Sequence, residues 1–428
     1  MKFAAVGDML IQQRIPEGYK GYEELRAFIE RGDARFFNLE TTLNEVGECP
    51  AAQQSGGTYI RTTPKVLGDI KKLGFNMMSF NNNHAFDFSH EGFIKTLEAV
   101  EATDFVHAGC GRNLAEASMA RFLDTPNGRV ALIAVNTNFN LAMLAGEQTD
   151  FVKGRPGING LRLDERFEVT EEEFEFVKRL AETTGVNVAR TISAKEGYYA
   201  LPKDDEARFG ELVFKKSDRT KWVRKVKKTD LERVLKAIEI ARFQADEVIV
   251  SVHSHQLDGT KKEDVSEFLQ EFAHTCIDNG ADAIVGHGPH LLRPIEVYKD
   301  KPIFYSLGDF IVQLYSVKFA PNEFYEKHGM TPDDGIYNLL RSRSKDFTVG
   351  LMEDKKMFET VIPYWETENG KLVKIELLPI MSKMDGNKSE IGLPRIAQDT
   401  SFMKRLNDIS EPFGVRVVEK DGKFVCEW

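Results

Sequence analysis

Short apolar runs separated by polar loops recur along the chain, and amphipathic stretches lie between them. The runs at residues 3–6, 36–39 and 77–80 have the length and largely apolar character of buried strands. Before the third run, apolar residues at helical spacing predict a helix over residues 66–73, which Gly74 closes in the manner of a C-cap glycine.

The alternation of strands and helices continues further along the chain. The other predicted strands are residues 130–135, 248–252, 283–285 and 303–307, and the other predicted helices are residues 91–102, 230–245 and 265–279. Residues 360–380 predict a terminal hairpin that turns at Glu368-Asn369-Gly370. This pattern is typical of an α/β fold with a largely parallel or mixed sheet and helices packed on it.

Two polar stretches, residues 137–228 and 316–356, interrupt this rhythm. The first contains one predicted helix, residues 170–182, and few buried strands. We expect both to be insertions into one catalytic domain, either as an active-site lid or as surface decoration. That domain is predicted to span residues 1–315, and residues 316–428 are predicted to be a C-terminal extension that completes or caps it.

Composition and charge narrow the class of protein. The chain has 428 residues, of which 42% are hydrophobic and 29% charged, with a net charge of −10. Nucleic-acid-binding domains usually carry a basic face, so this acidic balance argues against nucleic acid as a partner. The basic run at residues 215–228 is expected to be a solvated face, and it is the one concentrated candidate for docking an anionic polymer.

Cysteine usage and the start of the chain predict the compartment. Four scattered cysteines without a CxxC pair fit a reducing environment. The apolar run at residues 3–6 is far shorter than the roughly 7–15 apolar residues of a secretory signal. Since the sequence has no stretch near the roughly 18 apolar residues of a membrane helix, we expect a cytoplasmic protein without a membrane anchor.

Potential metal ligands follow five of the predicted strands. In chain order they are Asp8, Glu40, Asn83 with His84 and Asp87, His253 with His255, and His287 with His290. Five of the nine histidines lie in these loops. Ligands gather outside the carboxyl ends of strands in open α/β sheets, so we expect the five loops to converge on one site.

The residue types in these loops indicate the chemistry. Carboxylate, amide and imidazole ligands without a thiolate suit Mn, Fe or Zn and argue against a structural zinc site. There are too many ligands for one ion with open positions, so a two-metal centre with a bridging carboxylate is the natural interpretation. Such centres hold two ions about 3.5–4 Å apart and activate a water for hydrolysis.

These residues also lie in a recognisable set of motifs, in order over roughly residues 1–315. The motifs are Gly7-Asp8-Met-Leu, Asn38-Leu-Glu40-Thr-Thr, Asn82-Asn83-His84-Ala-Phe-Asp87, Ser251-Val-His253, Gly286-His287-Gly-Pro-His290 and Tyr305-Ser-Leu-Gly-Asp309-Phe. The set resembles the CapA family of poly-γ-glutamate capsule biosynthesis proteins, a branch of the calcineurin-like metallophosphoesterases. The resemblance implies a four-layer α-β-β-α sandwich with insertions.

The resemblance also implies a role for each matching residue. Asp8 and His290 would bind the first metal, Glu40 would bridge, and Asn83, His253 and His287 would complete the second. His84 would contact the substrate oxyanion or leaving group, with Asp87 as its orienting partner. Arg61, His255 and Asp309 are the candidate substrate-binding residues. Arg293, just after His290, is expected to be a surface arginine that pairs locally.

Three positions depart from the family pattern. Leu10 stands where the superfamily's opening Asp-x-His motif has histidine, so the first metal loses a ligand and its site is expected to be weak. Glu40 replaces the usual bridging aspartate, and Asp309 replaces the usual asparagine. Capsule-synthesis members commonly carry an N-terminal membrane anchor, which we expect this chain to lack. A capsule role therefore does not follow automatically from the resemblance.

Several functions remain open at this point. The first is hydrolysis of a phosphoester in a small or polymeric anionic substrate by metal-activated hydroxide. The second is the same centre acting on an amide, such as a γ-glutamyl linkage. The third is a binding or assembly protein that has lost chemistry through the Leu10 departure, and a fourth has the histidines stabilise loops only. The six intact ligand positions weigh against the third, and the improbable chance convergence of five such loops weighs against the fourth. The metal, the substrate and the oligomeric state are left open.

Overall fold

The computed structural model describes residues 1–53 and 55–428 and divides into two compact units. The first unit is formed by Met1–Leu161 and Glu232–Trp428, and the second by Arg162–Leu231. All of the predicted metal ligands belong to the first unit.

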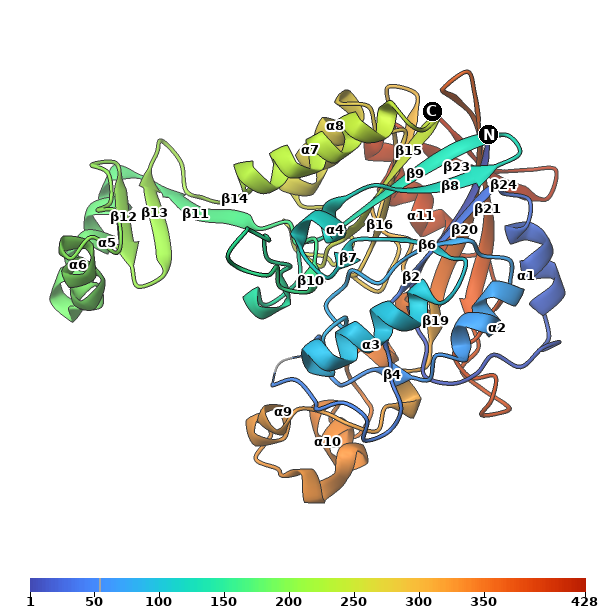
Figure 1. Ribbon diagram of the computed structural model, residues 1–428, viewed down its shortest axis with the longest axis horizontal. Helices are drawn as coiled ribbons and strands as arrows, with labels where there is room; N and C mark the ends of the chain where they lie inside the picture. The colour runs from blue at the N-terminus through green and yellow to red at the C-terminus, as the bar shows by residue number, and fades with distance from the viewer. Residues whose placement is uncertain (54) are drawn as a thin grey trace. The chain divides into compact units, whose positions relative to one another are not determined.

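A ten-stranded mixed sheet runs through the first unit (Figure 1). Its strands are β1 (Lys2–Leu10), β2 (Ala34–Leu39), β5 (Met77–Ser79), β6 (Val106–Ala108), β19 (Asp309–Val312), β20 (Glu359–Glu368), β21 (Lys371–Ser382), β22 (Pro394–Ile396), β23 (Arg416–Lys420) and β24 (Lys423–Glu427). They pair in the order β23-β24-β21-β20-β1-β2-β5-β6, with β19 beside β1 and β22 beside β21.

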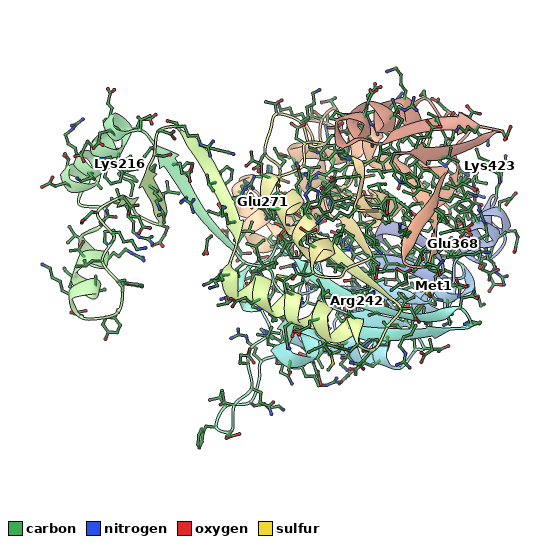
Figure 2. The ribbon with its side chains drawn as sticks, turned by 90° about the horizontal axis from the view of Figure 1, so that it is seen from above. Met1, Lys216, Arg242, Glu271, Glu368 and Lys423 are labelled. Carbon is green, nitrogen blue, oxygen red and sulfur yellow. The ribbon has the colours of Figure 1, made fainter. Side chains whose placement is uncertain are left out.

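Strand β1 holds the amino-terminal and carboxy-terminal parts of this sheet together. It is parallel to β2 and β19 and antiparallel to β20. Met1 and Glu368 accordingly lie at the same end of the first unit (Figure 2), where the amino group of Met1 donates to the Thr367 carbonyl oxygen at 2.6 Å. The region expected as a C-terminal extension thus supplies strands to the same sheet as β1.

A second sheet of six strands belongs to the same unit. Its members are β8 (Arg121–Thr125), β9 (Gly128–Asn136), β15 (Glu247–His253), β16 (Ala283–His287), β17 (Ile295–Tyr298) and β18 (Lys301–Phe304), in the order β17-β18-β16-β15-β9-β8. The three central strands β9, β15 and β16 are parallel. Their carboxyl ends therefore share one edge, and His253 is directly opposite His287 in the register.

The two sheets pack face to face. Phe3 and Ala5 of β1 share a buried cluster with Ala134 of β9 and Val285 of β16. Ala4, on the opposite face of β1, belongs to another cluster, which also holds residues of the helices named next. This alternation follows from the two-residue period of a strand. The helices are α1 (Tyr22–Ile29), α2 (Val66–Lys72) and α3 (Ser89–Glu101).

Helices also accompany the second sheet. α7 (Lys228–Arg242) and α8 (Glu267–Asp278) run beside β15 (Figure 1). Phe268, Phe272 and Cys276 are buried on α8 at the four-residue spacing of one helix face. The architecture of the first unit is therefore mixed α/β with several sheets, as the alternating pattern predicts.

Shorter elements connect these layers. They are β3 (Thr42–Leu43), β4 (Arg61–Thr62), β7 (Cys110–Gly111), α4 (Leu114–Ser118), η1 (Leu141–Met143), β10 (Gly157–Ile158), η2 (Leu314–Ser316), α9 (Asn322–Lys327), η3 (Pro332–Asp334), α10 (Gly335–Arg343), η4 (Leu351–Glu353), η5 (Lys355–Phe358), α11 (Phe402–Ser410) and η6 (Glu411–Phe413). None of the helices in the described ranges is long and apolar enough to cross a membrane.

The second unit has a sheet of its own. It contains β11 (Leu163–Val169), β12 (Glu206–Phe209), β13 (Leu212–Lys216) and β14 (Lys221–Val226), in the order β12-β13-β11-β14, with helices α5 (Glu171–Thr184) and α6 (Val188–Lys195). Its core is small and is centred on Val169, Phe174 and Ala207. The insertion expected at 137–228 therefore contains a compact folded unit.

Several predicted elements have different ends in the structure. The strand predicted at residues 3–6 continues through Asp8 to Leu10, because its second half pairs with β19. The strand predicted at 303–307 is β18, which begins at Lys301 and ends at Phe304. The predicted hairpin is confirmed: Asn369 and Gly370, with φ of 52° and 73°, join β20 to β21.

Candidate metal centre

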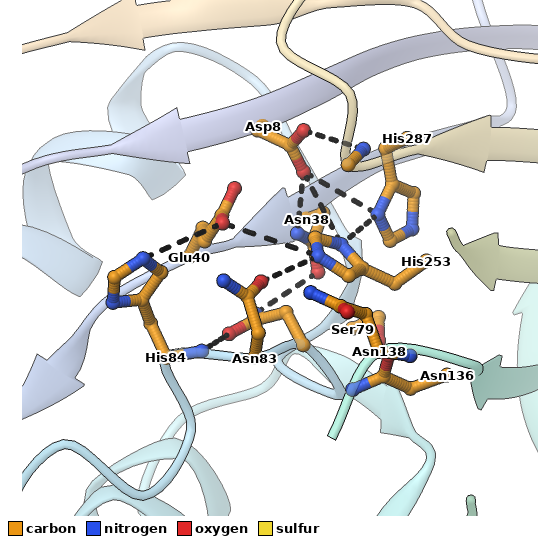
Figure 3. Close-up of polar contacts among 12 residues, drawn as sticks. Asp8, Asn38, Glu40, Ser79, Asn83, His84, Asn136, Asn138, His253 and His287 are labelled. Carbon is orange, nitrogen blue, oxygen red and sulfur yellow. Dashed lines mark hydrogen bonds and ion pairs between the residues drawn. The ribbon is translucent and has the colours of Figure 1, made fainter. Parts of the chain in front are cut away.

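The predicted ligands come together where strands of both large sheets end (Figure 3). Asp8 lies within β1, Glu40 directly follows β2, and Asn83 lies in the loop after β5. His253 and His287 are the last residues of β15 and β16. All five side chains are buried, so the site lies in the interior of the first unit.

A close approach of two backbones positions Asp8. A Cβ atom at Gly7 would lie 1.9 Å from the carbonyl oxygen of Gly308, so only glycine lets these segments come this close. The Asp8 amide donates to the same oxygen at 2.9 Å, and the strand register is irregular on both sides of Asp8. The carboxylate then points toward His287 and His253 (Figure 3).

Asp8, His253 and His287 form the centre of the cluster. The Asp8 Oδ1 atom lies 3.3 Å from His287 Nδ1 and 3.8 Å from His253 Nδ1. The two Nδ1 atoms are 2.9 Å apart. Two protonated nitrogens would repel at this distance, so at least one presents a lone pair toward the other and toward the carboxylate.

Glu40 faces this centre without a hydrogen-bond partner. Its side chain is fully buried, and neither carboxylate oxygen finds a donor among the described residues. Its Oε1 atom lies 3.9 Å from His84 Nε2 and 4.0 Å from His253 Nε2. An unpartnered buried carboxylate is costly, so this position favours protonation of the carboxyl group, a bound cation or a donor from outside the chain.

His84 and Asp87 form a separate pair at the edge of the cluster. His84 Nδ1 lies 2.7 Å from Asp87 Oδ2, which also accepts the amide of Ile60 at 2.7 Å. Because that oxygen is an acceptor, Nδ1 carries the proton and Nε2 is the nitrogen that faces Glu40. The structure thus places Asp87 where the predicted orienting partner of His84 should be.

Asp309 and His290 form a further hydrogen-bonded pair in the cluster. His290 Nδ1 lies 2.9 Å from Asp309 Oδ1, and the His290 backbone has the left-handed φ of 63°. The second Asp309 oxygen has no hydrogen-bond partner among the described residues. On the other side, His253 Nε2 lies 3.0 Å from His255 Nε2 and 2.7 Å from Asn83 Oδ1.

Burial and neighbouring charges shift the pKa values of the acidic groups Asp8 and Glu40 in opposite directions. For Asp8, burial raises the pKa, but the hydrogen bond and charge of His287 and the charges of His253 and His290 lower it well below the usual range. For Glu40, burial and the charges of Asp8 and Asp309 raise the pKa well above its usual value.

The pKa of Asp309 is raised to about 6 by burial, which the charge of His290 opposes. Burial also raises the pKa of Asp87, against the charge of His84. The site is therefore one where burying several carboxylates together is unfavourable for their charged forms.

Two of the buried histidines, His253 and His255, are held neutral. Burial lowers the pKa of His253 well below its usual value and that of His255 to about 3, with the neighbouring histidines adding to the effect. Burial also lowers the pKa of His290, but Asp309 outweighs it and the net shift is upward. Neutral imidazoles with available lone pairs are the form that binds metals.

These residues fit divalent metal ions. Three groups have ligand atoms within 4.8 Å of one another: Asp8, His253 and His287; Glu40, His253 and His255; and Asp8, His290 and Asp309. Among the described residues, no lysine or arginine pairs with any of these carboxylates. Oxygen and imidazole ligands with no internal counter-ion are the donor set of Mn, Fe or Zn sites.

The arrangement groups the ligands differently from the expectation. Asp8 belongs to two of the three groups, and His255 and Asp309, which were predicted to contact substrate, lie within the same distance as the predicted ligands. Arg61 lies elsewhere, with Nη1 donating to the Asn44 carbonyl oxygen at 2.7 Å. The expectation of a surface position for Arg293 is wrong, because that residue is 1% exposed and donates through Nε to the Lys262 carbonyl oxygen at 3.0 Å.

Three supporting groups were not predicted. Asn38 Nδ2 donates to Asp8 Oδ1 at 2.7 Å, and the Gly288 amide donates to Asp8 Oδ2 at 2.8 Å. Ser251 Oγ lies 2.8 Å from His287 Nε2, which leaves Nδ1 to face the site. Asn38 and Ser251 each stand two residues before a predicted ligand, and this alternate spacing within a strand is the signal that could have identified them.

Comparison with known proteins places this cluster in a family. Residues 2–314 match the family model described as bacterial capsule synthesis protein PGA_cap. The uncharacterized protein y4sH of Sinorhizobium fredii is 30% identical over 432 residues, covering 97% of this chain and 91% of that protein. The capsule biosynthesis protein CapA of Bacillus anthracis is 24% identical over 312 residues, covering 72% of this chain and 58% of that protein.

A solved structure is also similar in part. A hypothetical protein from Thermus thermophilus has a TM-score of 0.39 and 13% sequence identity, covering 89% of this chain and 98% of the other. The family match extends over more than half of the chain and contains every predicted ligand. The chain therefore belongs to the bacterial capsule synthesis protein PGA_cap family, the CapA family whose motifs its sequence carries.

Proposed function

We propose that this protein is a metal-dependent hydrolase that cleaves a phosphoester, on a fold of the calcineurin-like four-layer type. The observation that carries the proposal is the Glu40 carboxylate, which is buried, has no donor among the residues that the structure describes and faces His253 and His84. A chain that merely stabilised loops would gain by replacing such a group, since an unpartnered buried charge is strongly unfavourable.

The ligand groups divide between two ions that share acidic residues. Asp8, His290 and Asp309 would hold one ion, and His253 would hold the other, either with Glu40 and His255 or with Asp8 and His287. The presence of Asp309 in the first group compensates for the histidine that Leu10 replaces. Bound divalent ions would supply Lewis-acid polarisation of the phosphoryl oxygens and lower the pKa of the attacking water.

His84 supplies the proton for the leaving group. Asp87 accepts from Nδ1 and so fixes the ring with Nε2 toward the cluster. When the water oxygen attacks phosphorus, the bond from phosphorus to the leaving oxygen breaks, and a protonated Nε2 donates to that oxygen. General-acid assistance of this kind typically contributes about 10²–10⁴-fold to the rate.

The relatives suggest the setting of this reaction. One is described as the capsule biosynthesis protein CapA, and another, from Bacillus subtilis, as the PGA biosynthesis protein CapA, with 42% identity over 152 residues. We extend this to the present chain as a proposal that it acts in poly-γ-glutamate or capsule metabolism. The same centre could then cleave a γ-glutamyl amide, and substrate specificity separates the two reactions.

The test measures metal content and activity on the same samples. Protein purified without chelators is analysed for Mn, Fe and Zn beside Glu40→Gln and His253→Ala, and assayed with p-nitrophenyl phosphate, bis(p-nitrophenyl) phosphate and γ-glutamyl p-nitroanilide. We expect about two equivalents of metal in the parent protein, loss of metal in both variants, and cleavage of a phosphate ester.

Each alternative has its own outcome in this experiment. Cleavage of the anilide alone would replace the phosphoesterase with an amidase. One equivalent of metal would assign a one-metal enzyme. No metal after reconstitution with Mn, Fe and Zn would contradict the proposal and leave a binding or assembly protein.

A further inference from the structure

A small polar cavity lies beyond the metal centre on the strands that carry two of its ligands. It has a volume of about 70 Å³ and is lined by Gln12, Gln13, Tyr59, Arg61 and Lys318, among others. One water needs roughly 10–15 Å³ of such space, and pockets that enclose whole ligands have about 300–1,000 Å³. The cavity is therefore the size of one carboxylate or phosphate group.

The charges around this cavity are positive and unpaired. Arg61 and Lys318 form no ion pair with any acidic residue in the described part of the chain. Arg61 uses one nitrogen, Nη1, to donate to the Asn44 carbonyl oxygen, and the rest of its planar fork of donors has no such bond. Lys318 is exposed at the rim. Two cations without counter-ions around a polar cavity favour an anion.

Strands β1 and β19 connect the cavity to the metal centre. Asp8 pairs with Asp309 in the register, and both strands continue in parallel beyond them. Four residues further along, Gln313 Oε1 accepts the amides of Gln12 and Gln13 at 2.8 Å each. At a rise of about 3.3 Å per residue, the cavity lies on the order of 13 Å from Asp8.

A second segment also links the two places. A Cβ atom at Gly56 would lie 2.6 Å from His84 Nε2, so the backbone there runs directly over the catalytic candidate. The Ile60 amide donates to Asp87, and Arg61 follows at once with its side chain at the cavity. One continuous stretch of backbone thus passes from His84 to the cavity.

We propose that Arg61 and Lys318 form an anion subsite, which selects an extended substrate with a second anionic group about 13 Å from the scissile phosphoester. The inference rests on the proposed function for the position of the scissile group. A small phosphomonoester cannot span this distance, whereas an extended polyanion, with carboxylates or phosphates along its length, can. The subsite therefore favours a polymeric anionic substrate over a small one.

Equilibrium binding tests the subsite without depending on turnover. Calorimetry in the presence of chelator measures binding of two probes, hexa-γ-glutamate and linear hexaphosphate, to the full chain. The variants are Arg61→Ala and Lys318→Ala, and the control is Lys20→Ala, which removes the same charge from another exposed position. We expect each of the two subsite variants to weaken binding roughly tenfold, as for loss of a charge-assisted hydrogen bond, and the control to leave it unchanged.

The outcomes identify the anionic group that binds, and they distinguish failure of the subsite from failure of the proposed hydrolase function. Dependence on Arg61 with hexa-γ-glutamate alone assigns a carboxylate, and with hexaphosphate alone a phosphate. Equal binding by all four proteins, or an equal loss in Lys20→Ala, would overturn the subsite. The same samples are assayed with p-nitrophenyl phosphate after metal addition, and the Lys20→Ala control should retain the cleavage of the parent protein. Absence of cleavage with intact Arg61-dependent binding contradicts the hydrolase and leaves the subsite.

Discussion

At the scale of single residues, Glu40 is a buried carboxyl group without an internal partner. Neither carboxylate oxygen has a hydrogen bond within the described part of the chain, and burial with the charges of Asp8 and Asp309 raises the pKa well above its usual value. His253 and His255 are kept neutral by burial and supply no compensating charge. A bound cation would relieve this unfavourable arrangement, so metal binding and folding stability should be linked.

Glu40→Gln should therefore affect the unfolding temperature of the metal-free protein and that of the metal-bound protein differently. In chelator, we expect the variant to unfold at the same temperature as the parent or higher, because it removes a buried carboxyl group whose ionisation is unfavourable there. On adding Mn or Zn, only the parent should gain several degrees in Tm. Thermal unfolding with and without metal measures both effects. A metal-free variant that is clearly less stable than the metal-free parent would show that Glu40 has a donor.

Asp87 affects the reaction only through His84. In Asp87→Asn the amide oxygen can still accept from the Ile60 amide and from Nδ1, but it carries no charge and holds the protonated ring more weakly, so the ring loses its fixed orientation. We expect kcat on p-nitrophenyl phosphate to fall roughly 10–100-fold while the metal content is unchanged. Partial recovery in Asp87→Glu is the matched control. Loss of metal in Asp87→Asn would instead place Asp87 among the ligands.

At the scale of elements, α1 is attached to the sheet by a buried acid. Arg31, just after α1, donates from Nη1 and Nη2 to the two Glu376 oxygens at 2.7 and 3.0 Å, and its guanidinium lies 4.0 Å from the ring centre of Tyr364. Glu376 belongs to β21 and also pairs with Lys374 at 2.8 Å. The hydrogen bond to Arg31 and the charges of both cations lower the Glu376 pKa to about 2, against burial.

The lowered pKa of Glu376 predicts how the free energy of unfolding depends on pH. A carboxyl group with a folded pKa of about 2 and an ordinary value of 4.5 contributes its full stability above pH 4.5 and loses it as the pH falls toward 2. Glu376→Gln should lower the free energy of unfolding at pH 7 by about 1–3 kcal/mol and flatten the pH dependence in that window. Urea unfolding between pH 2 and 7 measures it, with the exposed Glu368→Gln as control. Equal slopes for parent and Glu376→Gln would contradict the prediction.

The elements also show which parts of the fold the sequence determines locally. Residues 36–39 and 248–252 were predictable because they are buried on both faces and form largely apolar runs. The extension of β1 through Asp8 depends on pairing with β19, some 300 residues away, which no local pattern contains. The strands of the second unit were missed because β11 and β14 are half-exposed and rich in charge.

The candidate site shows the same division. The ligands were found because each follows or ends an apolar strand, so burial of a polar residue there is itself unusual. The grouping of the ligands was not predictable, since it depends on how two sheets face each other. The expectation for Arg293 failed because its environment also depends on tertiary contacts. Its burial and its bond to the Lys262 carbonyl oxygen arise from a contact between separate segments of the sequence.

At the scale of the whole molecule, the second unit is attached through two neighbouring strands. Leu163 of β11 lies directly opposite Val226 of β14 in the antiparallel register. The residues that flank this pair are also bonded to each other. Arg162, before Leu163, donates to Asp230 at 2.7 and 2.8 Å, and the amide of Lys227, after Val226, donates to the Arg162 carbonyl oxygen at 2.8 Å. The chain therefore leaves and re-enters the first unit at two points that lie close together.

This geometry predicts that the second unit can be removed. Replacing residues 164–225 by Asn-Gly would join Leu163 to Val226 through a two-residue hairpin turn, because directly opposite strand residues have Cα atoms only about 4.5–5.5 Å apart. Every predicted ligand lies outside the deleted segment, and the pair between Arg162 and Asp230 is retained. We expect the shortened protein to fold with the same metal content and to cleave p-nitrophenyl phosphate within a few-fold of the parent.

The shortened protein also distinguishes a lid from surface decoration in the first insertion. If the second unit only decorates the surface, binding of hexa-γ-glutamate should be as tight as in the parent, since the Arg61 cavity is built entirely from the first unit. If it covers the site, the short substrate should still be cleaved while the long probe binds differently. Calorimetry and the ester assay on one preparation decide between these outcomes. Loss of metal with a folded core would contradict both, because it would make the deleted residues part of the centre.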